Sequence, residues 1–116
     1  MYYIEKNIKI RASNYLELGY DSRDKNNREY TYDITVKCKA KELNKDGMIV
    51  DFDTIIRAIE KLNHTNLNEV IPFNPTTENL AKYICHLIPY CYRVDISKGE
   101  DDKTTYIREK ELKWFL

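Results

Sequence analysis

Apolar and polar residues alternate along the chain from position 30 to position 41. One face of an extended chain would carry the apolar and aromatic members of this run, which are Tyr30, Tyr32, Ile34, Val36, Cys38 and Ala40. The other face would carry mostly lysine and threonine. Alternation with a period of two residues is typical of a strand with one buried face and one wet face. The pattern therefore predicts a strand here, with its lysine-rich face turned to solvent.

After Asp51 the apolar residues recur at intervals of three and four, which is the spacing of an amphipathic helix. Asp51 is a favourable N-cap, and Thr76 is a second one, with Glu78 in the first turn that follows. Two helices are therefore predicted, and Pro89 ends the second. The apolar stripe expected for the first helix is Phe52, Ile55, Ile56, Ile59 and Leu62. The stripe expected for the second is Leu80, Ile84, Leu87 and Ile88.

Strands are predicted on both sides of the two helices. They cover Ile4 to Ile10, 30–41, 92–96 and 103–109, with a polar loop over 17–27 and a hairpin turn over 98–102. The order is ββααββ, which predicts one α+β domain over 1–116, with a four-stranded antiparallel sheet and both helices on one face. The other face then needs water or a partner subunit, so we expect a homo-oligomer.

Composition limits the classes of function. The 116 residues suffice for one core, and 19 Lys and Arg balance 19 Asp and Glu. Because nucleic-acid-binding domains usually carry a basic excess, we expect no nucleic-acid polymer as a partner. No apolar run is long enough to span a bilayer, and the N-terminus lacks the apolar core of a signal peptide, which predicts a cytoplasmic protein without membrane contact. Cys38, Cys85 and Cys91 have no metal-ligand spacing and favour reduced thiols over a disulfide or a metal cluster.

Residues 46–84 contain three motifs in order, "GMIVDF", "LNHTNLN" and "NPTTENLA". They resemble the hallmark run of the 6-pyruvoyltetrahydropterin synthase and 6-carboxytetrahydropterin synthase family, with Asn63 in place of an aspartate. "TVKCKA" before this run and "YRVDI" after it extend the resemblance to most of the chain. The resemblance implies the T-fold, in which the sheets of ββααββ subunits join into a barrel. It also implies a hexamer of two trimers with substrate pockets between subunits.

The resemblance further implies a zinc ion held by three histidines, and those positions fall here on Asn14, Arg28 and Tyr30. The chain has two histidines in all, His64 and His86, so one subunit cannot supply three. An arginine does not lose its proton and would repel the cation. We therefore expect no metal and no cofactor.

The family's catalytic cysteine, aspartate and histidine correspond here to Asp24, Asn63 and His64. An asparagine cannot take up a proton, so His64 loses the carboxylate that would support it. The family's pterin-anchoring glutamate corresponds to Lys98, or to Glu100 if the hairpin is two residues shorter. A lysine donates hydrogen bonds and cannot accept them, so Lys98 would reverse the polarity of the pocket at that point.

Three positions near the implied pocket are cationic: Arg11, Arg28 and Lys98. With Tyr30, Asn63 and His64 they form the candidate ligand-binding set, and the charges suit a small anionic molecule. The alternative is that the three cations are solvated and pair with acidic neighbours, which are Asp21, Asp24 and Glu29. Tyr2, Tyr3, Tyr30 and Tyr32 are also interpreted as packing residues, and Trp114 and Phe115 as an anchor against a neighbouring subunit.

Three functions remain open from the sequence. The first is a catalytically degenerate family member that binds a small anionic heterocycle or nucleotide between subunits, for sensing or sequestration. The second is a metal-independent enzyme that acts on a pterin-like or purine-like substrate through His64 and Asp24. The third is an oligomeric scaffold with vestigial clefts.

Overall fold

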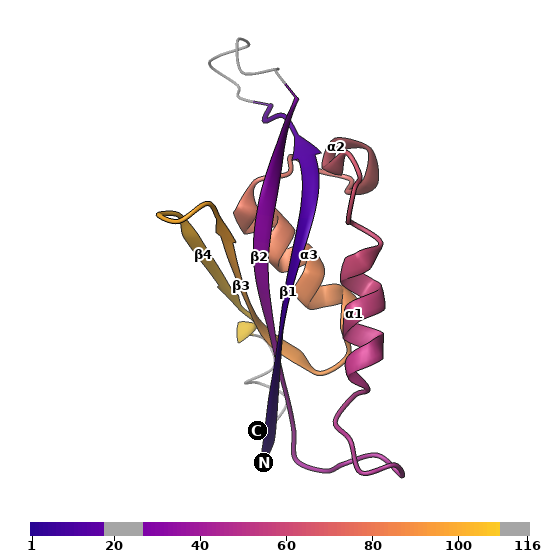
Figure 1. Ribbon diagram of the computed structural model, residues 1–116. Helices are drawn as coiled ribbons and strands as arrows, with labels where there is room; N and C mark the ends of the chain where they lie inside the picture. Colours follow the sequence, from indigo (N-terminus) through magenta and orange to yellow (C-terminus); the bar gives the residue numbers. More distant parts are fainter. Residues whose placement is uncertain (18–26, 110–116) are drawn as a thin grey trace.

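The sheet consists of two long strands and a shorter hairpin. In the computed structural model, which describes residues 1–17 and 27–109, β1 (Tyr2–Asn14) pairs antiparallel with β2 (Arg28–Ala40) along its whole length. On the other side of β2 lie β3 (Cys91–Lys98) and then β4 (Lys103–Ile107), both antiparallel to their neighbours. The β3–β4 hairpin bends away from the long β1–β2 pair (Figure 1). The predicted order of strands is confirmed.

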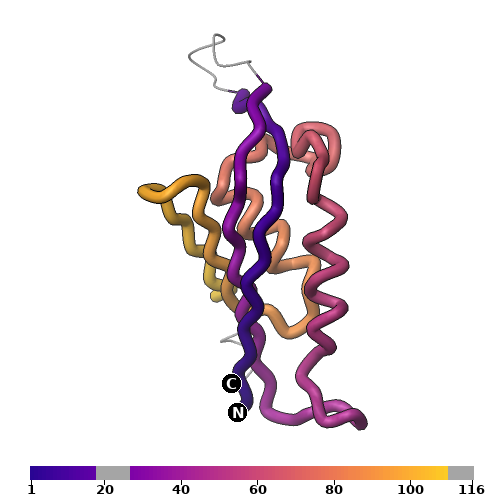
Figure 2. Tube along the Cα trace, in the orientation of Figure 1, coloured from indigo at the N-terminus to yellow at the C-terminus, as the bar shows by residue number. Residues whose placement is uncertain are grey.

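Within the described residues, three helices accompany the sheet. α1 (Phe52–Glu60) contacts β1, and α3 (Thr77–Leu87) contacts β3 and β4. Between them α2 (Leu67–Val70) forms one turn near the end of β1, as the chain trace shows (Figure 2). The α+β architecture with two main helices on one face is therefore confirmed. The additional turn α2 was not predicted, because its four residues are too few to show a helical period.

Both predicted N-caps are present. The Asp51 side chain accepts a hydrogen bond from the backbone N–H of Asp53 at 2.9 Å. The Thr76 hydroxyl accepts one from the backbone N–H of Asn79 at 3.1 Å. Each cap satisfies a backbone donor that the first turn of a helix leaves without a partner, which explains why the two helices begin where they do.

The core lies between the sheet and the helices. Its centre is formed by the predicted inner face of β2, where Tyr32, Ile34, Val36 and Cys38 are 0–1 % exposed. Two predicted stripe residues are not in the core, because Phe52 is 44 % and Leu87 is 47 % exposed. Phe52 is the first residue of α1, and helical side chains lean toward the N-terminus, so it projects past the helix end. Leu87 lies about 90° around α3 from the middle of the buried stripe.

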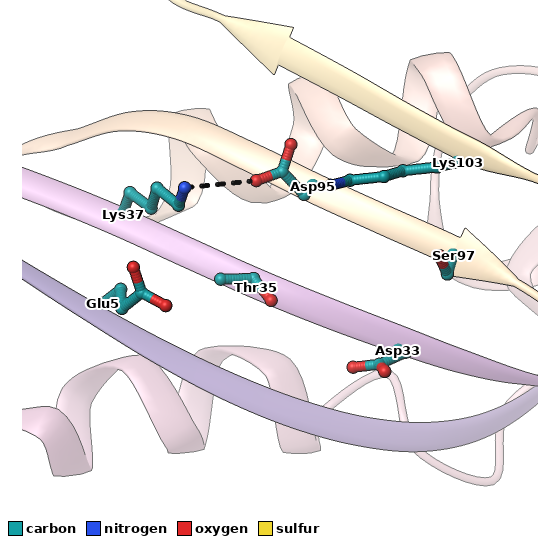
Figure 3. A pocket seen from close by; sticks show the side chains of 7 residues that line it. All are labelled: Glu5, Asp33, Thr35, Lys37, Asp95, Ser97 and Lys103. Atoms are coloured by element: carbon teal, nitrogen blue, oxygen red, sulfur yellow. Dashed lines mark ion pairs between the residues drawn. The ribbon is translucent and has the colours of Figure 1, made fainter.

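The opposite face of the sheet is polar. Figure 3 shows side chains from all four strands on the side away from the helices: Glu5, Asp33, Thr35, Lys37, Asp95, Ser97 and Lys103. Residues of opposite charge face each other across β1 and β2, as Glu5 does Lys37 and Lys9 does Asp33. Pairs of opposite charge across neighbouring strands contribute a small stabilisation to the sheet. We call this surface the wet face; most of its side chains are solvent-accessible, as predicted from the lysine-rich pattern.

The three cysteines are buried and free, as the composition suggested. They come from β2, α3 and β3, and Cys38 lies opposite Cys91 in the sheet. A hydrogen bond with Cys38, together with burial, raises the pKa of the Cys91 thiol to about 12. The Cys91 thiol is therefore protonated at neutral pH.

Among the helices that the structure describes, none has the length and apolar character needed to cross a bilayer.

Candidate functional site

A depression of about 560 Å³ lies between the start of α3 and the β3–β4 hairpin. Thr76, Thr77 and Glu78 line it from α3, and Lys98 and Thr104 line it from the hairpin. We call it the Lys98 depression. Thr76, Thr77 and Glu78 lie together for a local reason, because they form the N-cap and the first turn of α3.

The aromatic ring of Tyr30 fixes the position of the Lys98 side chain. Lys98 ends β3 opposite Tyr32 of β2, and both side chains lie on the helix side of the sheet. The Lys98 ammonium nitrogen is 3.8 Å from the centre of the Tyr30 ring. A cation over the face of an aromatic ring is attracted by the ring's quadrupole. The structure thus brings two of the predicted ligand-binding residues, Tyr30 and Lys98, into contact, and Lys98 lines the depression.

The three positions on which the resemblance implied zinc ligands share one face of the β1–β2 pair. Asn14 lies opposite Arg28, and Tyr30 follows two residues along β2 on the same face. Asn14 is 2 % exposed; its side-chain oxygen accepts a hydrogen bond from the Tyr32 hydroxyl at 2.9 Å, and its side-chain nitrogen donates to the Pro75 carbonyl at 3.4 Å.

These three side chains do not fit a zinc ion. An amide engaged in two hydrogen bonds, a guanidinium and a phenol supply none of the donors that zinc prefers. Within residues 1–17 and 27–109, no three or more histidine, cysteine, aspartate or glutamate side chains gather in a group that could hold a metal ion.

The remaining candidates lie at the β1 edge of the sheet, two strands away from Lys98 in β3. The Asn63 side chain accepts a hydrogen bond from the backbone N–H of Arg11 at 2.9 Å and donates one to Glu60 at 3.2 Å. The backbone N–H of His64 donates to the Arg11 carbonyl at 2.6 Å. Asn63 and His64 therefore hold the connection after α1 against the free edge of β1. His64 has a left-handed backbone (φ 60°) and an exposed side chain.

Arg11 points to the wet face, and its guanidinium is 2.5 Å from the Glu29 carboxylate. Within one chain the candidates thus form two groups, Arg28, Tyr30 and Lys98 in one and Arg11, Asn63 and His64 in the other. Strands β1 and β2 lie between Lys98 and His64, which corresponds to roughly 10 Å or more. Asp24, Trp114 and Phe115 lie outside the described residues.

A sequence model described as 6-pyruvoyl tetrahydropterin synthase matches residues 3–109. The chain belongs to this family. Over 53 residues it is also 38% identical to a protein of Pyrococcus horikoshii named "Putative 6-carboxy-5,6,7,8-tetrahydropterin synthase". That match covers 46% of this chain and 33% of the Pyrococcus protein, so it spans about a third of that relative.

Several solved structures have the same fold. The 6-pyruvoyl tetrahydropterin synthase of Caenorhabditis elegans superposes with a TM-score of 0.71 at 20% identity, over 91% of this chain and 94% of the other. An uncharacterised protein of Wolinella succinogenes gives 0.69 at 15% identity, over 93% and 98%. The Plasmodium vivax 6-pyruvoyl tetrahydropterin synthase gives 0.61 at 12% identity, over 91% and 98%. At these identities the likeness establishes the fold.

The sequence analysis of this family member missed part of the Lys98 depression. Thr76 and Glu78 were assigned only to the start of a helix, and Thr77 was not singled out, although "PTTE" places three hydrogen-bonding side chains in succession beside a loop. Glu100, the alternative to Lys98, lies exposed at the tip of the hairpin next to Gly99 (φ 91°). It is not among the described residues that line the depression, whereas Lys98 is.

Two asparagines fix the chain on the far wall of the depression, where Leu16 lies. The Asn68 side chain accepts from the backbone N–H of Tyr15 at 2.9 Å and donates to its carbonyl at 3.0 Å. The Asn74 side chain does the same with Glu17, at 2.9 and 3.1 Å. Each amide thereby makes the two hydrogen bonds that a neighbouring strand would otherwise make, one with the backbone N–H and one with the carbonyl of the same residue. Leu16 is held between these two fixed points.

Asp95 is a buried acid on the wet face that the sequence analysis did not identify; it is 6 % exposed. Its carboxylate accepts hydrogen bonds from Arg93 at 3.2–3.3 Å and from the Thr105 hydroxyl, and it is 3.7 Å from the Lys37 ammonium. Burial by itself would raise the pKa of the Asp95 carboxyl. The hydrogen bonds from Thr105 and Arg93 and the charges of Arg93 and Lys103 outweigh it and lower that pKa below its ordinary value.

Proposed function

We propose that this member of the 6-pyruvoyl tetrahydropterin synthase family binds a small anionic heterocycle or nucleotide, for sensing or sequestration. We further propose that it does not carry out the zinc-dependent synthase reaction that its sequence resemblance implied. The observation that carries the proposal is the ammonium of Lys98, held 3.8 Å above the Tyr30 ring at the wall of a depression of about 560 Å³. A cation held at the wall of a depression suits the anionic or carbonyl edge of a small ring.

The residues at the three metal positions support the loss of the synthase reaction. Asn14 is committed to Tyr32 and Pro75, and Arg28 keeps its charge at any physiological pH. The Asn63 amide holds the backbone of Arg11, so it does not act on the His64 ring. Within the described residues the His64 imidazole has no carboxylate partner, which removes the usual means of activating it.

We propose that the ligand pocket is completed between subunits of a homo-oligomer, a hexamer of two trimers. The sheet supports this, because β1 and β4 are its two edges and the helices of the described residues cover one of its faces. Joining edges of two copies would bring the His64 side of one subunit toward the Lys98 side of the next, which reunites the two groups of candidates. Sedimentation equilibrium should report six chains, and a monomer at micromolar concentration would contradict this assembly.

A thermal-shift panel of nucleotides, inorganic phosphate and anionic heterocycles tests the binding proposal. A ligand at a hundredfold excess over its Kd should stabilise the protein by about 2.7 kcal/mol. Lys98→Ala should abolish the shift, because the pocket then loses its fixed donor. Lys45→Ala is the matched control, since Lys45 is an exposed lysine in a turn far along the chain from the depression. If no anion stabilises the wild-type protein, the proposal is wrong and the scaffold function is favoured.

The enzyme alternative predicts a different result. If His64 and Asp24 transfer protons without metal, chelator-treated protein should convert a pterin-like or purine-like substrate, and His64→Ala should abolish this turnover. The structure offers no specific support for it, since the described residues separate His64 from the Lys98 depression within one chain.

A further inference from the structure

We infer that residues 110–116, with the sequence "KELKWFL", dock on one end of the wet face of their own chain. This contact is independent of the proposed ligand site, because it involves the end of the sheet away from the β3–β4 turn that lines the Lys98 depression. Three observations support it: an exposed apolar patch, the bulge that helps to form the patch, and the point at which the described chain ends.

Large apolar side chains occupy one end of the otherwise polar wet face. Tyr3, two residues before Glu5 in β1, is 63 % exposed, and Ile107, two residues after Thr105 in β4, is 50 % exposed. The rings of Tyr3 and Tyr92 contact each other edge to face, with 5.9 Å between their centres. We call Tyr3, Tyr92 and Ile107 the apolar patch. Exposed apolar side chains that gather on a polar surface indicate a contact site.

A β-bulge turns Tyr92 toward this patch. The register between β2 and β3 shifts at Cys38, and Tyr92 is the extra residue of β3 at this point. Strict alternation would place Tyr92 on the face opposite to its neighbour Arg93, which lies on the wet face. Instead, the centre of the Tyr92 ring is 4.9 Å from the ammonium nitrogen of Lys39, which is on the wet face as well. Bulges commonly re-aim one side chain in this way, and here the result is a second aromatic ring beside Tyr3.

The described chain ends beside the patch. The backbone N–H of Arg108 donates to the Tyr92 carbonyl at 2.9 Å, and Glu109 is the last residue described. Seven extended residues reach about 23 Å. The three strand spacings from β4 to β1 amount to about 14 Å. Residues 110–116 are therefore long enough to cross the patch from Ile107 to Tyr3.

The sequence of this segment suits an apolar site. Four of its residues are large and apolar: Leu112, Trp114, Phe115 and Leu116. The sequence analysis expected Trp114 and Phe115 to contact a neighbouring subunit. Their own chain is the favoured partner, because the bond from Arg108 to Tyr92 starts the segment at its own patch. A segment tethered in this way has a roughly millimolar effective concentration, which exceeds that of a separate copy in a micromolar solution.

The fluorescence of Trp114, the only tryptophan in the sequence, tests the inference. In the wild-type chain, Trp114 should emit at a shorter wavelength than in urea, and acrylamide should quench it several-fold less. Tyr3→Ser should move both values toward those of the unfolded chain. Its circular dichroism should stay unchanged, because Tyr3 is mostly exposed. Ile107→Ser should act in the same direction. Tyr2→Ser is the matched control, since Tyr2 is 50 % exposed but lies on the opposite face of β1, and it should change neither value.

A mixing experiment distinguishes the segment's own patch from that of a neighbouring subunit. Tyr3→Ser chains are refolded with an excess of Trp114→Phe chains, which keep the patch and contain no tryptophan. Docking within one chain predicts the fluorescence of Tyr3→Ser alone. Recovery of the wild-type emission would show that the segment binds a neighbour, which contradicts the inference.

Three other results would also overturn it. If Trp114 is as accessible in the wild-type chain as in the unfolded one, the segment does not dock. If Trp114 stays protected in both Tyr3→Ser and Ile107→Ser, the segment docks elsewhere. If Tyr2→Ser exposes Trp114 as much as Tyr3→Ser does, the wet face is not the docking surface.

Discussion

Val36→Lys should leave the chain unfolded, whereas Thr35→Lys should fold. Val36 is fully buried on the inner face of β2, so a lysine there would place an ammonium in the core without a partner. An uncompensated buried charge costs several kcal/mol, which is comparable to the whole stability of a small domain, about 5–15 kcal/mol. Circular dichroism and urea denaturation of the two variants measure the difference.

Thr35→Lys is a matched control because it introduces the same side chain one residue away, on the wet face. Thr35 lies opposite Asp95, which offers the new ammonium an opposite charge. The variant loses the hydrogen bond from Asn7 to the Thr35 hydroxyl, so its free energy of unfolding should fall by no more than about 1 kcal/mol. Equal effects of the two substitutions would show that β2 does not have one buried face and one wet face.

Asp95→Ala should lower the free energy of unfolding by about 2–3 kcal/mol. The substitution leaves Arg93 and Lys37 close together without the carboxylate between them, and Thr105 without its acceptor. Arg93 is about a third exposed, so solvent screens part of this repulsion and the full cost of breaking a buried pair is not expected. Asp33→Ala is the control, since Asp33 lies on the same face but is more exposed than Asp95.

The contribution of Asp95 should also depend on pH in one direction. Its pKa is lowered in the folded protein, so the unfolded chain takes up the proton first as the pH falls. The stabilisation is therefore complete above about pH 5 and is lost progressively below about pH 4. Urea denaturation at a series of pH values should show the wild-type protein and Asp95→Ala converging as the pH falls. A difference that stays constant down to pH 2 would contradict this account of Asp95.

The sequence predicted features that depend on neighbouring residues. Burial alternates along β2 because a strand turns successive side chains to opposite faces, and the caps at Asp51 and Thr76 act on backbone groups two or three residues away. The motif resemblance predicted the family and the T-fold. It could not predict α2, whose single turn is stabilised by tertiary contacts of the buried Leu67.

The candidate site was harder to predict, because it depends on which face each strand residue occupies and on registers between distant strands. Arg11 was grouped with Arg28, whose partner across the strands is Asn14. Arg11 precedes Asn14 by three positions, and positions three apart lie on opposite faces of a strand. This signal was present in the sequence. The placement of Lys98 above Tyr30 and the burial of Asp95 between Arg93 and Thr105 depend on the β2–β3 and β3–β4 registers, which local patterns do not determine.

The central claim is that an ammonium held on an aromatic ring, and not a divalent metal ion, defines the chemistry of this pocket. The most direct test is the zinc content of protein purified without chelators, measured by inductively coupled plasma mass spectrometry. The account predicts far less than one zinc per chain, and no increase after incubation with zinc and desalting. One tightly held zinc per chain, lost when Asn14 or His64 is replaced by alanine, would contradict it.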